Sequence, residues 1–149
     1  MIKIGVITVS DSCYQGKRKD ESGSFIKKKA KERGWEVICY KVVPDEKKMI
    51  KKALSEFRDK GADIIFTTGG TGLSKRDITP EATREVIEKE IPGIGEIMRI
   101  ETFKETKYSV LSRGIAGISK DALIINLPGS LKGVIESLSV ILPILEHCI

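Results

Sequence analysis

The sequence predicts an α/β fold of three layers, in which a doubly wound, mostly parallel sheet carries helices on both faces. Short apolar stretches rich in Ile and Val alternate along the chain with longer amphipathic stretches. Each amphipathic stretch is long enough to return the chain to the start of a parallel neighbour, which requires a crossover helix. Polar or glycine-rich turns follow the apolar stretches, where ligands bind in open parallel sheets.

The composition fits one globular domain over residues 1–149, because 40% of the residues are apolar and 32% are charged. The three cysteines are widely spaced, which argues against a disulfide framework and a zinc site. No apolar run approaches the roughly 20 residues of a membrane helix. The first residues read as a strand and lack the layout of a signal peptide. We therefore expect a cytoplasmic protein with no membrane segment.

The net charge of +5 raises the possibility of a nucleic-acid partner. However, the lysines lie mainly in helical stretches among glutamates, which is typical of solvated helix faces. Aromatic residues make up only 5% of the chain and form no RNA-binding signature. We therefore expect no nucleic acid, and an anionic small molecule would use the same positive field.

The first half of the chain predicts alternating strands and helices. Pro44 ends the second strand, and Asp45 is the expected N-cap of the helix that follows. Gly34 and Gly61 supply the stop signals of the two helices. The expected elements are a strand over residues 2–10, a loop over 11–20, a helix over 21–33, a strand over 35–43, a helix over 45–60 and a strand over 63–67.

The second half predicts two helices, a strand and a closing helix. Thr79 is the expected N-cap of the first helix, with Pro80 at its first position. Pro143 is expected to kink or restart the closing helix. The expected elements are a helix over residues 79–90, a break over 91–95, a helix over 96–106, an unassigned stretch over 108–117, a strand over 121–126 and a helix from 131.

The stretch from Thr67 to Thr83 is the most distinctive of the turns, and its three glycines lie among the hydroxyl residues Thr67, Thr68, Thr71 and Ser74. It fits neither a P-loop nor a dinucleotide fingerprint, because the lysine–hydroxyl pair and the third glycine of those motifs are missing. A turn with positive φ would explain one or two of the glycines. Three glycines flanked by hydroxyls favour a loop whose amides and side chains surround phosphate.

Asp45 and Asp77 are the candidate catalytic carboxylates, since each follows a predicted strand. Asp45 is alternatively an N-cap, and Asp77 is alternatively the partner of Arg76 or Lys75 in an ion pair. Nucleotidyl transfer needs a divalent cation, and Mg²⁺ is commonly held by one or two carboxylates with substrate oxygens. Two aspartates at neighbouring strand ends meet that need.

With these motifs in place, the chain resembles the molybdopterin-binding family of molybdenum-cofactor biosynthesis proteins over nearly its whole length. The residues that carry the resemblance are Ser10-Asp11, Gly16, Asp20, Ser22-Gly23, Pro44-Asp45, Thr67-Thr68-Gly69-Gly70-Thr71-Gly72, Arg76-Asp77, Thr79-Pro80-Glu81-Ala82-Thr83, Pro92-Gly93-Ile94-Gly95-Glu96, Ser112-Arg113 and Asn126-Leu127-Pro128-Gly129.

The resemblance implies a molybdopterin-binding fold, commonly a homotrimer, with other enzymes of the pathway as possible partners. It also implies adenylylation of the terminal phosphate of molybdopterin by ATP and Mg²⁺. Asp45 and Asp77 match the aspartates implicated in that chemistry and would hold the metal. The residues expected to bind pterin or nucleotide phosphate are Ser10, Asp11, Thr68, Gly69, Gly70, Thr71, Gly72, Ser112, Asn126, Pro128, Gly129 and Ser130.

One departure from the family pattern leaves a second function open. The adenylyltransferases commonly have a proline shortly after the Leu-Pro-Gly turn, whereas this chain continues with Ser130-Leu131. That continuation, together with Gly72-Leu73-Ser74-Lys75, resembles the branch usually called protein B. The alternative hypothesis is therefore a non-catalytic protein that binds or delivers molybdopterin.

Overall fold

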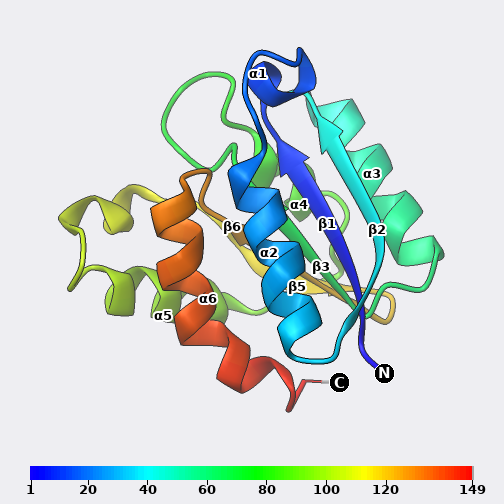
Figure 1. The fold of residues 1–149 in the computed structure, drawn as a ribbon. Helices are drawn as coiled ribbons and strands as arrows, with labels where there is room; N and C mark the ends of the chain where they lie inside the picture. The colour runs from blue at the N-terminus through cyan, green and yellow to red at the C-terminus, as the bar shows by residue number, and fades with distance from the viewer. Residues whose placement is uncertain (149) are drawn as a thin grey trace.

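A computed structural model describes residues 1–148 and shows a six-stranded sheet with helices on both faces (Figure 1). The strand order is β2-β1-β3-β6-β5-β4; the first four strands are parallel and the last two join antiparallel. The predicted fold class is therefore confirmed. The elements are β1 (Lys3–Val9), α1 (Asp11–Tyr14), α2 (Glu21–Glu32), β2 (Glu36–Val43), α3 (Lys47–Asp59), β3 (Ile64–Thr68), α4 (Thr79–Arg84), β4 (Lys89–Glu90), α5 (Pro92–Thr102), the 3-10 helix η1 (Lys107–Leu111), β5 (Ala116–Ser119), β6 (Ala122–Leu127) and α6 (Leu131–Leu145).

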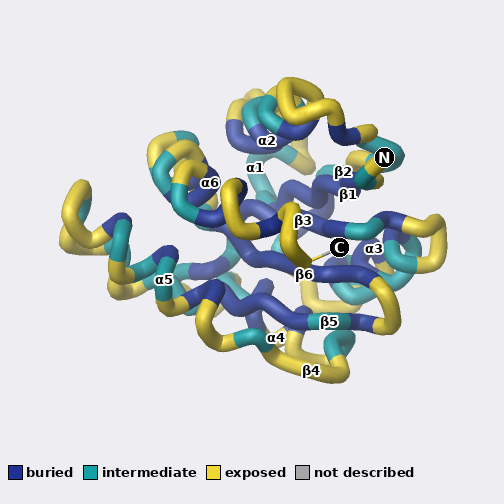
Figure 2. The backbone as a smooth tube through the Cα atoms, turned by 90° about the horizontal axis from the view of Figure 1, so that it is seen from below, coloured by how far each residue is buried: buried dark blue, intermediate teal, exposed yellow. Residues whose placement is uncertain are grey.

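The sheet separates two apolar cores because successive side chains of a strand point to opposite faces. In β1, Ile4 and Val6 pack in the core that includes α2, α5 and α6, while Ile7 and Val9 pack in the core beneath α3 and α4. Figure 2 shows the central strands buried between α2 and α6 on one side and α4 on the other. Full burial of one such side chain contributes about 1.5–3 kcal/mol. The two cores thus hold the sheet firmly between its helices.

The register of the parallel strands brings their carboxyl ends level. Thr8 of β1 pairs with Thr68 of β3, which pairs with Leu127 of β6, and Val9 pairs with Val43 of β2. The loops that follow these four strands therefore begin at one edge of the sheet, as the sequence predicted. All four strands lie within one residue of their predicted bounds. Within residues 1–148, no helix combines the length and apolar character needed to cross a membrane.

The predicted starts of the helices after β2 and β3 are wrong. Helix α3 begins at Lys47 after Glu46, so Asp45 lies outside the cap and its side chain binds elsewhere. Helix α4 has Ile78 at its N-cap position, and Thr79 is already its first residue. Pro80 fits this first turn because its missing N–H would have no partner there.

The region after Arg84 was predicted least well. Helix α4 ends at that residue and not at 90, because Lys89 and Glu90 form the strand β4 against β5. Helix α5 begins at Pro92 rather than 96, and it ends at Thr102 rather than 106. The prediction of a break at Pro92 was wrong, because proline is favourable at the first position of a helix and Pro92 occupies that position in α5.

Three further segments add detail that the sequence did not supply. The stretch left unassigned contains all but the first residue of η1 and the start of β5. The predicted loop over residues 11–20 contains the one-turn helix α1, capped by the side chain of Ser10. Helix α6 continues through Pro143 as far as Leu145 and does not restart there.

Candidate functional site

A cavity of about 320 Å³ lies at the carboxyl ends of the parallel strands. It collects residues from the loops that follow β1, β2, β3 and β6, which are more than a hundred residues apart at their extremes. The predicted site residues that line it are Ser10, Asp45, Thr68, Gly69, Gly70, Asp77, Gly129 and Ser130. The structure therefore brings both candidate catalytic carboxylates and the glycine loop to one place.

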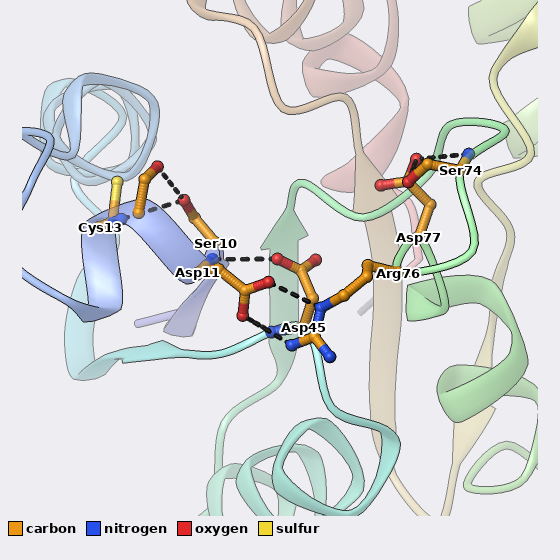
Figure 3. Close-up of polar contacts among 8 residues, drawn as sticks. Ser10, Asp11, Cys13, Asp45, Ser74, Arg76 and Asp77 are labelled. Atoms are coloured by element: carbon orange, nitrogen blue, oxygen red, sulfur yellow. Dashed lines mark hydrogen bonds and ion pairs between the residues drawn. The ribbon is translucent and has the colours of Figure 1, made fainter.

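Asp45 is held in the cavity by a reciprocal pair of hydrogen bonds with Asp11. The N–H of Asp11 donates to Oδ2 of Asp45 at 2.9 Å, and the N–H of Asp45 donates to Oδ1 of Asp11 at 3.0 Å (Figure 3). Arg76 clamps the Asp11 carboxylate from outside, through Nε at 2.8 Å and a terminal nitrogen at 2.9 Å. Asp11 does not line this cavity, so it positions Asp45 here, and its predicted contact with ligand stays a prediction.

The charges around Asp45 make it a favourable place for a cation. Burial raises the pKa of the Asp45 carboxyl, and the Asp11 and Asp77 carboxylates raise it further, against the opposing effects of the Asp11 N–H and Arg76. The Arg76 hydrogen bonds lower the pKa of Asp11, so that neighbour stays negative. A bound cation would relieve this concentration of negative charge.

Asp77 is fixed by its own loop. Its Oδ2 accepts hydrogen bonds from the N–H of Ser74 at 3.0 Å and from the Ser74 hydroxyl at 2.9 Å (Figure 3). The ion pair with Arg76 that the sequence allowed is not formed, because Arg76 turns to Asp11. The Asp77 carboxylate is thus oriented by uncharged donors, and it forms no ion pair within residues 1–148.

The glycine loop needs its glycines because it lies against other backbone. Gly69 has φ +100° and Gly70 has φ +70°, conformations that other residues rarely adopt. A Cβ on Gly69 would lie 2.2 Å from the carbonyl oxygen of Val9, and one on Gly70 would lie 2.2 Å from Oγ1 of Thr79. The N–H of Gly69 bonds to the Leu127 carbonyl at 3.2 Å. Within residues 1–148 the Gly70 and Gly129 N–H groups donate no hydrogen bond and are available to a ligand.

Three of the other predicted residues lie around a second cavity, whereas Thr71 and Gly72 lie in the glycine loop and line neither cavity. A cavity of about 220 Å³ is lined by Ser112, Asn126 and Pro128, and Ser130 lines both cavities. The Asn126 side chain is occupied, since its amide donates to the Thr67 and Thr83 hydroxyls and its oxygen accepts from the Ile115 N–H. The carbonyls of Thr71 and Gly72 accept hydrogen bonds from Arg113. The sequence prediction therefore spans two cavities that share Ser130.

Arg113 was not among the predicted site residues, although it fastens the far side of the glycine loop. Its guanidinium donates to the Gly72 carbonyl at 2.7 Å, to the Asp77 carbonyl at 2.7 Å and to the Glu81 carboxylate at 2.6 Å. These partners lie 32 to 41 residues away in the sequence. No local pattern predicts such contacts; the signal available was that Arg113 is among the residues that carry the family resemblance.

The sequence prediction also missed the wall of the cavity formed before α2. Arg18, Lys19, Asp20 and Ser22 line it, so two cations face the same space as the two aspartates. Asp20 caps α2 through the Gly23 N–H and accepts a hydrogen bond from the Thr8 hydroxyl at 2.6 Å. The signal available for this wall was that Asp20 and Ser22 are among the residues that carry the family resemblance, with Arg18 and Lys19 directly before them.

The donor set fits a cation shared with a substrate better than one caged by protein. Within residues 1–148, no group of three or more His, Cys, Asp or Glu side chains is arranged to hold a metal. Asp45 and Asp77 each have one carboxylate oxygen that accepts no hydrogen bond within that part of the chain. Mg²⁺ is usually bound by one or two carboxylates with waters and substrate phosphates, which these two residues match.

We expect Asp45→Asn to stabilise the metal-free protein at pH 7.5. Because the pKa of Asp45 is higher in the folded state than its ordinary value of 3.8, the folded protein binds more protons than the unfolded chain just above that pH. The free energy of unfolding therefore falls as the pH rises from 3.8 through the folded-state pKa. Asparagine does not ionise, so the Asp45→Asn variant avoids this loss of stability. Its gain in the free energy of unfolding is at most about 1 kcal/mol because the Asp45 carboxyl is only half-buried. Urea unfolding at pH 7.5 and at pH 4 checks this, with a smaller gain at pH 4. A variant less stable than wild type at pH 7.5 would contradict it.

Residues 5–147 match the family described as probable molybdopterin binding domain. The molybdopterin adenylyltransferase of Helicobacter pylori J99 is 41% identical over 151 residues, which cover 99% of this chain and 86% of that protein. The molybdenum cofactor synthesis protein cinnamon of Drosophila melanogaster is 42% identical over 150 residues; they cover 99% of this chain, which spans only 25% of that longer protein.

A solved structure shows the same likeness in three dimensions. The molybdopterin biosynthesis enzyme MoaB from Thermus thermophilus is 47% identical and superposes with a TM-score of 0.93, over 99% of this chain and 93% of that chain. The match over nearly all residues and the cavity at the strand ends lead to the same conclusion: this chain belongs to the molybdopterin-binding domain family.

Proposed function

We propose that this protein acts in molybdenum-cofactor biosynthesis as a molybdopterin adenylyltransferase that uses ATP and Mg²⁺. The observation that carries the proposal is the presence of Asp45, Asp77 and the glycine loop around one cavity. The similarity to molybdopterin adenylyltransferases over nearly the whole chain supports it.

In the proposed reaction, an oxygen of the terminal phosphate of molybdopterin attacks the α-phosphorus of ATP. A new P–O bond forms to AMP, the bond between the α-phosphorus and its bridging oxygen breaks, and pyrophosphate leaves. Mg²⁺, when bound, supplies positive charge for the phosphate oxygens. Asp45 and Asp77 are the residues that would hold it, each through its free carboxylate oxygen.

The remaining groups of the cavity bind and orient phosphate. The free N–H groups of Gly70 and Gly129 donate hydrogen bonds to phosphate oxygens, and Arg18 and Lys19, which line the same cavity, supply positive charge. Donors fixed before the reaction stabilise the charge of the transition state without reorganising. Arg113 keeps the Gly72–Asp77 segment in place by binding the carbonyls at both of its ends.

A second candidate function is a protein that binds or delivers molybdopterin without chemistry. The Ser130-Leu131 continuation favours it, and both residues line the cavity beside Gly129. This hypothesis keeps the pterin site but requires no binding of ATP.

Product analysis separates the two functions. The purified protein is incubated with molybdopterin, ATP and Mg²⁺, and the products are identified by chromatography and mass spectrometry. We expect adenylylated molybdopterin and pyrophosphate in equal amounts, and neither when Mg²⁺ is chelated. Tight pterin binding by calorimetry, without ATP binding or product, would reject the transferase and favour the binding protein.

We also propose a cytoplasmic homotrimer. Exposed apolar side chains occur on α5, at its C-cap and on η1, where a neighbouring copy would cover them. Light scattering of the purified protein measures the mass of the assembly. These side chains are Ile100, Phe103, Tyr108, Val110 and Leu111.

A further inference from the structure

The second cavity is lined by a carboxylate that has one oxygen without a hydrogen-bond partner. Glu136, on α6, lines this cavity of about 220 Å³ with only 13% of its side chain exposed. Its Oε2 is fully buried and accepts no hydrogen bond, while its Oε1 lies 3.9 Å from Nζ of the largely exposed Lys132. That separation is too long for a hydrogen bond. A buried carboxylate without donors is costly, which indicates that a ligand supplies them.

The same cavity is lined by a cation without an anionic partner. Arg99, on α5, donates to the backbone carbonyls of Gly114 at 2.9 Å and Ser112 at 3.4 Å. Within residues 1–148, Arg99 forms no ion pair. The cavity therefore presents a carboxylate with one unpartnered oxygen in Glu136 and a donor-rich group without an ion pair in Arg99.

This pattern is complementary to the 2-amino-4-oxo edge of a pterin. That edge carries two adjacent donors, the 2-amino group and N3–H, followed by the acceptor at the 4-oxo oxygen. A carboxylate accepts two parallel donors at once, and such charge-assisted pairs are the stronger hydrogen bonds. The buried side chain of Met98 adds an apolar wall for the rings. Cavities for drug-sized ligands measure about 300–1,000 Å³, so this smaller one suits a single ring system.

We propose that Glu136 binds the 2-amino group and N3–H of the pterin and so selects pterins over pteridines with a 2-oxo group. This inference rests on the proposed function, because it identifies the residue that recognises the substrate of that site. Ser130 lines both cavities, so a molybdopterin whose rings contact Glu136 directs its phosphate toward Asp45 and Asp77.

The test compares two fluorescent probes, pterin and lumazine, which carries an oxygen in place of the 2-amino group. We expect wild type to bind pterin more tightly than lumazine by about 10- to 100-fold, the range for losing a hydrogen bond to a charged group. Glu136→Gln, which conserves the shape of the side chain, should bind pterin more weakly than wild type by the same factor. It should also bind pterin and lumazine with similar affinity. Lys132→Ala, the matched control, should keep the wild-type preference.

Two further measurements separate recognition from a structural role. Glu136→Gln loses only a long ion pair with the largely exposed Lys132, and such surface pairs contribute little to stability. The variant should therefore melt at or above the wild-type temperature, and its affinity for Mg²⁺-ATP should be unchanged. Equal binding of both probes by wild type, wild-type discrimination by Glu136→Gln, or a lowered melting temperature would overturn the inference. A wild type that discriminates between the probes but forms no adenylylated product would reject the transferase and leave the role of Glu136 supported.

Discussion

Replacing Asp45 with asparagine is expected to lower the rate of adenylyl transfer by more than 100-fold while the protein stays folded, and Asp77→Asn should do the same. Changes in residues that only support metal ligands already cost about 10- to 100-fold, so the loss of a ligand's charge should exceed that range. The amides keep the acceptors for the Asp11 N–H and for Ser74, so the local geometry survives. Only the negative charge facing the cavity is removed.

The rates are measured from pyrophosphate release at several Mg²⁺ concentrations, and both variants should need more Mg²⁺ for half-maximal activity. Asp63→Asn is the matched control, because its carboxylate also accepts a backbone N–H, that of Lys3 at 2.8 Å, but at the opposite end of β3. It should react at the wild-type rate. Full activity in both Asp45→Asn and Asp77→Asn would show that these carboxylates do not perform the chemistry.

The position of Asp45 and Asp77 could be predicted from the sequence because topology alone determines it. Apolar stretches separated by helices imply parallel strands, and the ends of parallel strands meet at one edge of the sheet. The prediction therefore succeeded in bringing Asp45, Asp77 and Gly70 together. The prediction that Asp45 caps the following helix was wrong. An aspartate just before a helix is typical of an N-cap, and the sequence does not show which way its side chain points.

What escaped prediction depends on contacts between distant residues. Arg113 reaches Gly72 across 41 positions, and Asp11 reaches Asp45 across 34, with no periodicity to reveal either pair. The edge strands β4 and β5 escaped for a related reason. They are two and four residues long, and pairing with the already formed β6 stabilises them more than any local preference does.

Gly69 and Gly70 are predicted site residues that line the cavity. Replacing Gly69 with alanine should lower the free energy of unfolding more than the same change at a control glycine. Gly61 is the control, since its φ of +95° is close to the +100° of Gly69 but a Cβ there would meet nothing within 4 Å. Gly61→Ala should cost about 1–2 kcal/mol, the strain of the left-handed conformation alone. In Gly69→Ala, a Cβ 2.2 Å from the Val9 carbonyl adds a steric term of about 1–3 kcal/mol.

This steric term cannot be relieved by a small shift of the loop. Val9 is held in β1 by its pairing with Val43, and Gly69 is tied to Leu127 through its own N–H. Urea unfolding of both variants measures the difference, and titration with Mg²⁺-ATP shows whether the displaced loop still binds. Gly69→Ala should lose affinity while Gly61→Ala keeps it. Equal destabilisation of the two variants would mean that the loop moves freely over β1, and a mobile loop could not hold its amides ready for phosphate.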